Sequence, residues 1–399
     1  MSVFENALRS VVSTPTLLGA YPSFGYANLT QSAKKVNVRS SLTISAFYSG
    51  VDKIANSIAI LPHSVVQKTE DTIEVLDSHA VHGLLNKKAN YYQTPFNFKH
   101  LIASTVLLRG NYFAGIIRDD NGKLIGLDFW DHNLVTVIDY NDELFYLYKE
   151  NTYKSHEVLH VPGFSFDGKL GKSILEFAAD NMGTTLNAQK FGSSSLEDQG
   201  LTYGVIETEK KLDSKAKDAI GSAFEKRMTT MNKHRAAVLD ETMKYKKIGL
   251  NPEESKFIET YANGIEDIAR WLHVPNHKLN IKGEGGYNSL IQMEQEYLQT
   301  AVKPLAQKIK EEFNAKLFTD NEKNQNISID QNFKILLQVD PKSRAEYYKS
   351  MVFLKAMTPN EIRKLESMNP YDDGDQFLQM SNLLNEQQLK KLVQDENPE

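Results

Sequence analysis

Residues 251–273, NPEESKFIETYANGIEDIARWLH, decide the fold, because they predict one long amphipathic helix. The opening Asn251–Glu254 combines an Asn N-cap, a Pro in the first turn and two acids at the positive end of the helix dipole. The helix ends before Pro275, and its twenty-two residues would span about 33 Å. One apolar stripe follows the helical period, at Ile258, Tyr261, Ile265, Ile268 and Leu272.

A second predicted helix, residues 173–199, lies upstream and is rich in small side chains, which allow a neighbouring helix to approach closely. Between the two helices, residues 201–250 carry eleven Lys and Arg against seven Asp and Glu, a net charge of +4. We predict that this insert contains a helix at 214–232 and strands at 203–207 and 236–239. The pattern is therefore two long helices that flank a small α/β insert.

The chain before these helices predicts an α+β unit. Residues 1–40 are rich in Ser, Thr, Gly and Tyr without a clear period, which indicates an irregular arm. Thr94 and Pro95 form a favourable helix start, and Gly110 a favourable stop. Asp119–Gly122 is a strong hairpin turn. The predicted helices are 45–60, 78–90 and 94–109, and the predicted strands are 63–68, 72–76, 112–118, 124–130, 134–138, 144–149 and 158–161.

The chain after residue 275 predicts a loop followed by helices. Residues 276–289 are polar and Gly-rich, which is typical of a mobile loop. A helix follows at 290–317, with a kink expected at Pro304. The remaining predicted elements are strand-like runs within 327–339 and helices at 344–356 and 358–368. The segment from Glu366 onward contains eight acidic residues and two lysines, which gives it a net charge of −6.

Composition narrows the class of protein. The chain has 399 residues, 41% of them hydrophobic and 24% charged, which is typical of a soluble globular protein of two to three domains. No run approaches the roughly 20 apolar residues of a membrane span, and Glu5 and Arg9 make the N-terminus a poor signal peptide. The absence of cysteine excludes disulfides, Cys-based zinc sites and thiol catalysis. A net charge of −5 argues against tight DNA binding.

Two short motifs suggest chemistry that their context does not support. His156–His160 matches H-E-x-x-H, but that zinc-hydrolase pattern needs a helix, and Pro162 with its β-branched neighbours favours a strand. Gly168–Ser173 hints at a phosphate-binding loop, yet Phe166 stands where the motif needs Gly. A helix-entry turn with at most weak anion binding is the better interpretation. We expect no catalytic site, metal or cofactor.

Seven groups of segments, in order along the chain, resemble the portal proteins of tailed bacteriophages of the long-tailed siphovirus type. The resemblance covers roughly residues 45–378, and one departure is Met357, where that family often has Gly before the T-x-N-E-x-R segment. The segments are 48–62 (YSGVDKIANSIAILP), 82–86 with 95–98 (HGLLN, PFNF), 109–112 with 118–122 (RGNY, RDDNG), 157–173 (EVLHVPGFSFDGKLGKS), 268–279 with 287–295 (IARWLHVPNHKL, YNSLIQMEQ), 304–318, and 358–363 (TPNEIR).

The resemblance implies an α+β portal fold, with an α/β wing, a two-helix stem, a small α/β clip insert and a helical crown. By matching position the chain divides into an N-terminal arm (1–40), the wing (41–170), a stem helix (171–199), the clip (200–250), a second stem helix (251–275), a tunnel loop (276–289), a helix with wing return strands (290–345), and the crown with an acidic tail (346–399).

The resemblance also implies the function. Twelve copies would form a ring at one capsid vertex of the virion, assembled in the host cytoplasm. The ring would pass double-stranded DNA during packaging and ejection. It would dock the terminase large subunit, head-completion or adaptor proteins, and the major capsid and scaffold proteins. Neither an enzymatic activity nor a membrane partner is implied.

DNA must slide through such a ring, so we expect scattered basic groups on an acidic surface rather than strong phosphate contacts. Plain surface charge is the alternative interpretation of each lysine. The candidates for transient DNA contact are Asn276, Lys278, Asn280, Lys282, Lys244, Lys246 and Lys247. The candidates for partner docking on the clip are Lys226, Arg227, Lys233 and Arg235.

Two other hypotheses stay open at this point. One is a different phage head or tail component, such as an adaptor or a capsid protein, which would lack paired long helices around an insert. The other is a zinc metallohydrolase that uses His156, Glu157 and His160.

Overall fold

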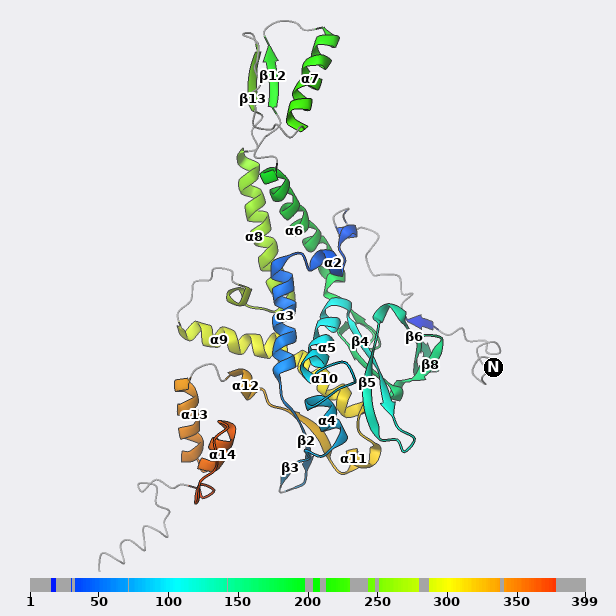
Figure 1. Cartoon of the computed structure of the whole chain (residues 1–399), viewed down its shortest axis with the longest axis vertical. Helices are drawn as coiled ribbons and strands as arrows, with labels where there is room; N and C mark the ends of the chain where they lie inside the picture. The colour runs from blue at the N-terminus through cyan, green and yellow to red at the C-terminus, as the bar shows by residue number, and fades with distance from the viewer. Residues whose placement is uncertain are drawn as a thin grey trace, which may run out of the picture. The chain divides into compact units, whose positions relative to one another are not determined.

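The computed structural model describes residues 16–18, 30, 33–70, 72–141, 143–197, 204–208, 213–229, 243–247, 251–279, 287–337 and 341–377 (Figure 1). The chain forms two compact units, residues 1–330 and 331–399. Within these described ranges, no helix combines the length and apolar character needed to cross a membrane. Helices and antiparallel strands mix in the first unit, so the predicted α+β class is confirmed.

The helices of the first unit begin and end largely where the sequence places them. Thr94 caps α5 by accepting a hydrogen bond from the Asn97 N–H, and Gly110 ends that helix with φ of 81°. α3 and α5 pack against each other and contribute much of the core. The helices in this part are α2 (Val38–Ser41), α3 (Ser45–Ile60), α4 (Ala80–Asn86) and α5 (Pro95–Arg109), with 3-10 turns at Ala33–Lys35, His132–Leu134 and Ser155–Glu157.

The strands form small antiparallel sheets, with strand orders β5-β4-β9, β1-β6-β7-β8 and β14-β2-β3. Two further two-stranded sheets are the β10-β11 hairpin and the pair β12-β13. The strands are β1 (Thr16–Leu18), β2 (His63–Lys68), β3 (Ile73–Val75), β4 (Asn111–Arg118), β5 (Leu124–Trp130), β6 (Val135–Tyr140), β7 (Glu143–Tyr148), β8 (Asn151–Lys154), β9 (Val158–Pro162), β10 (Phe164–Ser165), β11 (Gly171–Lys172), β12 (Gly204–Thr208), β13 (Met243–Lys247) and β14 (Ile327–Gln331).

Two long helices, α6 (Ile174–Glu197) and α8 (Asn251–Leu272), lie side by side (Figure 1). The Asn181 amide donates a 2.6 Å hydrogen bond to Asp267 across the pair. Gly264 faces Thr185 so closely that a Cβ at this glycine would lie 2.2 Å from the Thr185 hydroxyl oxygen. The predicted pair of long helices is present. The close contact between them is made by Gly264 of α8, whereas a Cβ at Gly192, one of the small residues of α6, would have no neighbouring atom within 4 Å.

The insert between the two helices contains α7 (Ser214–Thr229) and the two-stranded antiparallel sheet β12-β13, and α7 lies between the two strands in sequence. Gly204 pairs with Lys247 and Thr208 with Met243, so β12 finds its partner at 243–247. The strand predicted at 236–239 lies outside the described residues. The strand that completes this sheet is the lysine-rich MKYKK, whose polar composition conceals it from a hydrophobicity pattern.

The loop predicted at 276–289 is helical at both ends, which corrects that expectation. Asn276–Leu279 forms a 3-10 turn that packs on α3 and buries Leu279, and α9 (Tyr287–Tyr297) already begins at Tyr287. Residues 280–286 lie outside the described ranges. Leu279 is the apolar anchor that holds the first turn of this segment.

Pro304 interrupts the following helix, as expected, but through a π-helical turn rather than a simple kink. Because Pro has no N–H to continue the α-helical ladder, Leu298–Val302 widens and Lys303 bonds back to the Leu298 carbonyl before α10 (Lys303–Lys316) begins. Further along, the described part of the strand-like region, residues 327–337, is β14 followed by a helical turn, α12 (Lys334–Leu337). The short α11 (Asp320–Asn324) precedes β14.

The second unit contains α13 (Pro341–Phe353) and α14 (Pro359–Leu365). Thr358 and Glu361 form a capping box that starts α14, and α14 ends three residues earlier than predicted. The Asn360 side chain bonds to both the N–H and the carbonyl of Tyr371. The T-x-N-E-x-R segment therefore holds this small unit together. Residues 378–399, the acidic tail, lie outside the described ranges.

The contact between Gly264 and Thr185 yields a stability prediction. Gly264→Ala should lower the free energy of unfolding by about 1–3 kcal/mol, because the new methyl group overpacks a buried, β-branched neighbour. Gly83→Ala on α4, where no atom lies within 4 Å of the added Cβ, should be neutral or stabilising. Urea unfolding measures both. The Gly264→Ala/Thr185→Ala double variant should recover part of the lost free energy of unfolding. If the losses of the two single variants simply add in the double variant, the contact is contradicted.

Candidate functional site

Asn111, at the start of β4, joins three segments that are distant in sequence. Its side-chain amide donates a 2.7 Å hydrogen bond to the Gly171 carbonyl, and its side-chain oxygen accepts one from the Gly171 N–H at 2.7 Å. The same oxygen lies 3.0 Å from Nε2 of His160. Asn111 is only 4% exposed. Buried polar groups must be paired, so these bonds fix the relative position of β4, β9 and β11.

Close backbone contacts between glycines complete this Asn111 junction, which we define as Asn111, Gly110, His160, Gly163 and Gly171. The Gly163 N–H donates a 2.7 Å hydrogen bond to the Gly110 carbonyl. A Cβ at Gly171 would lie 2.0 Å from the same carbonyl oxygen, and Gly110 has a positive φ. Larger residues would collide here, which explains the glycines of the RGN, VPG and KLG segments.

The Asn111 junction also sets where the long helix α6 begins. The Ser173 hydroxyl donates a 2.8 Å hydrogen bond to the Leu108 carbonyl in the last turn of α5. It also accepts a hydrogen bond from the Leu175 N–H, at 3.1 Å, which caps the start of α6. One side chain thus ties the first turn of α6 to the end of α5.

The H-E-x-x-H segment does not have the geometry of a zinc hydrolase. His160 is buried in β9, where Nδ1 lies 3.0 Å from the Tyr146 hydroxyl and Nε2 lies beside Asn111. His156 and Glu157 are exposed on a separate 3-10 turn. Among the residues that the structure describes, no three His, Asp or Glu side chains are placed to hold a metal ion. The sequence expectation of a strand here is confirmed.

The Gly168–Ser173 segment is likewise a structural turn. It closes the β10-β11 hairpin, and a side-chain oxygen of Asp167 accepts hydrogen bonds from the Lys169 N–H at 2.8 Å and the Leu170 N–H at 3.1 Å. The Ser165 hydroxyl accepts the Gly168 N–H. Oxygen atoms of the chain itself therefore already accept hydrogen bonds from the backbone N–H groups that a phosphate would need.

The structure gives one of the candidate DNA-contact residues an internal partner. Lys278 Nζ lies 2.7 Å from a carboxylate oxygen of Glu294 and 4.6 Å from the centroid of the Tyr297 ring. Its side chain is 22% exposed. A Lys278 contact with phosphate would therefore require this pair to separate. Asn276 is exposed at the start of its 3-10 turn.

The other candidates fall on the insert or outside the described ranges. Lys244, Lys246 and Lys247 all lie on β13, and Lys244 is exposed opposite Glu207. Lys226 and Arg227 lie on α7. Asn280, Lys282, Lys233 and Arg235 lie outside the described residues. The structure thus places three of the candidate lysines on one strand, on a different element from the 276–279 turn.

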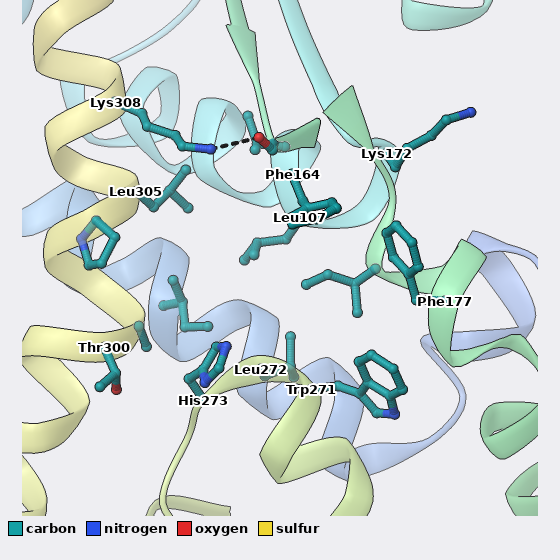
Figure 2. Close-up of a pocket in the computed structure, with 16 residues that line it drawn as sticks. Leu107, Phe164, Lys172, Phe177, Trp271, Leu272, His273, Thr300, Leu305 and Lys308 are labelled. Carbon is teal, nitrogen blue, oxygen red and sulfur yellow. Dashed lines mark hydrogen bonds between the residues drawn. The ribbon is translucent and has the colours of Figure 1, made fainter. Parts of the chain in front are cut away.

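An apolar groove with a cavity of about 420 Å³ lies between α10, α3, the β10-β11 hairpin and the end of α8. The sequence patterns did not single out this groove. We call it the aromatic groove and define it by Phe164, Phe177, Trp271, Leu272, Leu305 and Lys308. Figure 2 shows Phe177, Trp271 and Leu305 turned toward the same space from three elements. The aromatic residues of F-S-F, in a hairpin turn where polar residues are usual, were the available signal.

The comparisons with known proteins agree with this architecture. The model of a family described as "Phage portal protein" matches residues 45–367, which is most of the chain. The chain belongs to the phage portal protein family. The family recognised from the seven segment groups is thereby confirmed, and it is a structural rather than a catalytic family.

Two relatives carry the same description at low identity. The chain is 24% identical over 368 residues to the probable portal protein of Streptomyces phage phiC31, covering 86% of this chain and 78% of that protein. It is 23% identical over 353 residues to the portal protein of Enterobacteria phage HK97, covering 85% and 82%.

A solved structure shares the fold. It is the neck of a native gene transfer agent particle computed with C12 symmetry, with a TM-score of 0.56 and 17% identity. The match covers 86% of this chain and 95% of that chain. The predicted portal fold and the role of head–tail connector are confirmed.

The buried His160 predicts a pH dependence of stability. Burial lowers its pKa to about 3, with Lys316 and His132 adding to the shift, against about 6.5 in the unfolded chain. Between these values only the unfolded state binds the proton, so stability falls as pH drops from about 6.5 to 3, by about 1.4 kcal/mol per pH unit. Urea unfolding at several pH values should show a shallower fall for His160→Gln. The exposed His156→Gln is the matched control; equal slopes for both variants would contradict the burial effect.

Proposed function

We propose that twelve copies of this chain form a ring at one vertex of the capsid, through which double-stranded DNA is packaged and later ejected. The observation that carries the proposal is the α6–α8 pair, two long helices packed along each other with a small insert between them in sequence. Family membership and the C12 symmetry of the gene transfer agent neck support the ring and its twelvefold closure.

The dimensions and charge of the α6–α8 pair suit a DNA channel. The helices have 24 and 22 residues, about 36 Å and 33 Å at 1.5 Å per residue. α6 contains three acidic residues and one lysine, and α8 contains five acidic residues and two basic ones. Like charge keeps the phosphate backbone from adhering to the wall. DNA can then slide past the helices instead of being held.

The division of the chain follows the family architecture. We assign residues 1–40 to the arm, 41–170 to the wing, 171–199 and 251–275 to the stem, and 200–250 to the clip. Residues 276–289 are the tunnel loop, with a helical turn at its start that the structure adds. Residues 290–345 comprise a helix and wing return strands, and 346–399 the crown and acidic tail.

Transient DNA contacts are assigned to the clip strand and the tunnel loop. Lys244, Lys246 and Lys247 form one basic strand. Asn276, Asn280 and Lys282 belong to the loop, whereas Lys278 reaches phosphate only after it leaves Glu294. Because each contact exchanges counterions for one phosphate, a few scattered lysines give weak and reversible binding.

The clip is the proposed docking surface for the terminase large subunit and later for a head-completion or adaptor protein. Its net charge of +4 contrasts with the acidic stem. The candidate contacts are Lys226, Arg227, Lys233 and Arg235. The major capsid and scaffold proteins would contact the ring from the shell, and assembly would take place in the host cytoplasm.

Native mass spectrometry with electron-microscope class averages tests the ring directly. Twelve chains of 45.2 kDa should give a particle of about 540 kDa with a central hole. Where the isolated chain does not close, quantitative mass spectrometry of purified capsids gives the copy number. About twelve copies per capsid support the proposal, and a copy number in the hundreds, typical of a shell component, would overturn it.

The clip lysines yield a second test. Lys244→Gln/Lys246→Gln/Lys247→Gln should leave the ring mass unchanged and lower the yield of DNA-filled particles, because three phosphate contacts are lost together. Lys87→Gln/Lys88→Gln, exposed lysines after α4, are the control and should package normally. If both variants package DNA equally well, the lysines of β13 do not contact the DNA.

A further inference from the structure

Two exposed cations lie beside α6, near the start of that helix. The 3-10 turn Ala33–Lys35 and α2 both pack on α6, and the Thr30 hydroxyl fixes this segment by donating a 2.7 Å hydrogen bond to Asp180 of α6. The side chains of Lys35 and Arg39 are exposed on it. Among the residues that the structure describes, neither has an ion-pair partner. We call Lys35 and Arg39 the basic patch.

The charge of the basic patch is not balanced by its surroundings. Residues 6–51 contain no Asp or Glu, but they contain four basic residues. The two acids of α6 closest in sequence to this contact are already engaged, because Asp180 accepts the Thr30 hydroxyl and Glu176 pairs with Lys172. An acidic partner for the basic patch must therefore come from elsewhere.

The other long helix exposes an acidic face. Spacings of four and three place Glu259, Asn263 and Glu266 on one side of α8, whereas Gly264, which contacts α6, lies on the far side. Glu259 is exposed and has no ion-pair partner within the described ranges. The Glu266 side chain is 43% exposed, and its contact with Arg270 is a 3.5 Å pair at the surface. We call Glu259, Asn263 and Glu266 the acidic face.

The basic patch and the acidic face lie at the same level along the helix pair. The segment that carries the patch is fixed at Asp180, and the next residue, Asn181, bonds to Asp267, which follows Glu266. Glu259 lies about 10 Å further along α8. Figure 1 shows α2 and α8 on opposite sides of α6. Rotation about a ring axis changes no height along that axis, so these two surfaces can meet between neighbours.

We propose that the basic patch of each chain contacts the acidic face of the next copy of this chain. The inference rests on the proposed ring. Head-to-tail contacts need two different, complementary surfaces on each chain, and these two differ in sign and match in level. Opposite charges fix the register of an interface, while like charges placed together oppose association. The contact is repeated at every interface of the ring.

The first test reverses the charge of each surface in the full chain. Lys35→Glu/Arg39→Glu and Glu259→Lys/Glu266→Lys should each raise the protein concentration for half-assembly at least about tenfold, because like charges then meet. The monomers should keep the wild-type circular dichroism spectrum. The variant with all four substitutions should assemble at nearly the wild-type concentration, because opposite charges meet again.

The second test mixes the two charge-reversed variants in equal amounts. The patch made acidic in one variant then meets the face made basic in the other, so rings should form in which the two variants alternate. A purification tag on one variant should recover the other in equal amount. Ion pairs within a single chain would not be restored by mixing, so this experiment separates a contact between chains from one inside a chain.

Matched controls carry the same changes of charge elsewhere. Lys87→Glu/Lys88→Glu, after α4, and Glu70→Lys/Glu74→Lys, near the turn between β2 and β3, alter exposed residues outside both surfaces. Both controls should assemble like the wild type. Where the ring closes only in capsids, the number of copies per capsid replaces the half-assembly concentration.

The outcomes separate this inference from the proposed function. Impaired assembly of both reversed variants, restored in the fourfold variant and in the mixture, supports the contact. A wild-type ring with reversed variants that assemble normally overturns the contact and leaves the ring standing, and so does impaired assembly that neither combination restores. Normal assembly of Lys35→Glu/Arg39→Glu with less packaged DNA would instead make the basic patch a DNA contact. A wild type that forms no ring, even in capsids, overturns both proposals.

Discussion

The bidentate hydrogen bond between the Asn111 side chain and the backbone of Gly171 is the constraint on which the rest of the structure depends. It is made inside the core, where an unpaired amide would cost about 1–3 kcal/mol, and it leaves no freedom in the register of β4, β9 and β11. The neighbouring glycines allow the backbones to meet at that distance. Ser173 then starts α6 two residues later. The direction of the long helix is thus set by a buried polar cluster rather than by a loop.

Close side-chain contacts also position the long helices α6 and α8. Thr185 and Gly264 allow α6 and α8 to approach closely, and Leu272 at the end of α8 fills the space that Gly50 leaves on α3. In the proposed ring, force from moving DNA would fall on the stem helices. A stem that is fixed at its base by paired polar groups, and whose two helices meet closely at Thr185 and Gly264, would transmit that force to the wing instead of bending. The buried His160, neutral because burial lowers its pKa to about 3, keeps the base free of uncompensated charge.

Local signals predicted most of the elements, because caps and turns act over a few residues. Thr94, Gly110 and the Asn251–Glu254 opening each contain their own stop or start information, and the structure follows them. Long-range partners were not visible in the sequence. Nothing in the pattern links Asn111 to Gly171, pairs Lys278 with Glu294, or gathers Phe164, Phe177 and Trp271 around one groove. The polar β13 was also missed, since pairing with β12, and not hydrophobicity, makes it a strand.

Hydrogen–deuterium exchange of the Asn111→Ala variant tests the central claim most directly. The informative amides are those of Gly163 and Leu175, which bond to Gly110 and Ser173 and do not touch Asn111. If Asn111 holds the base of α6, both amides lose protection together with Gly171, while the amides of α14 keep theirs. If only the Gly171 amide exchanges faster, Asn111 is a local contact and the position of α6 is set elsewhere.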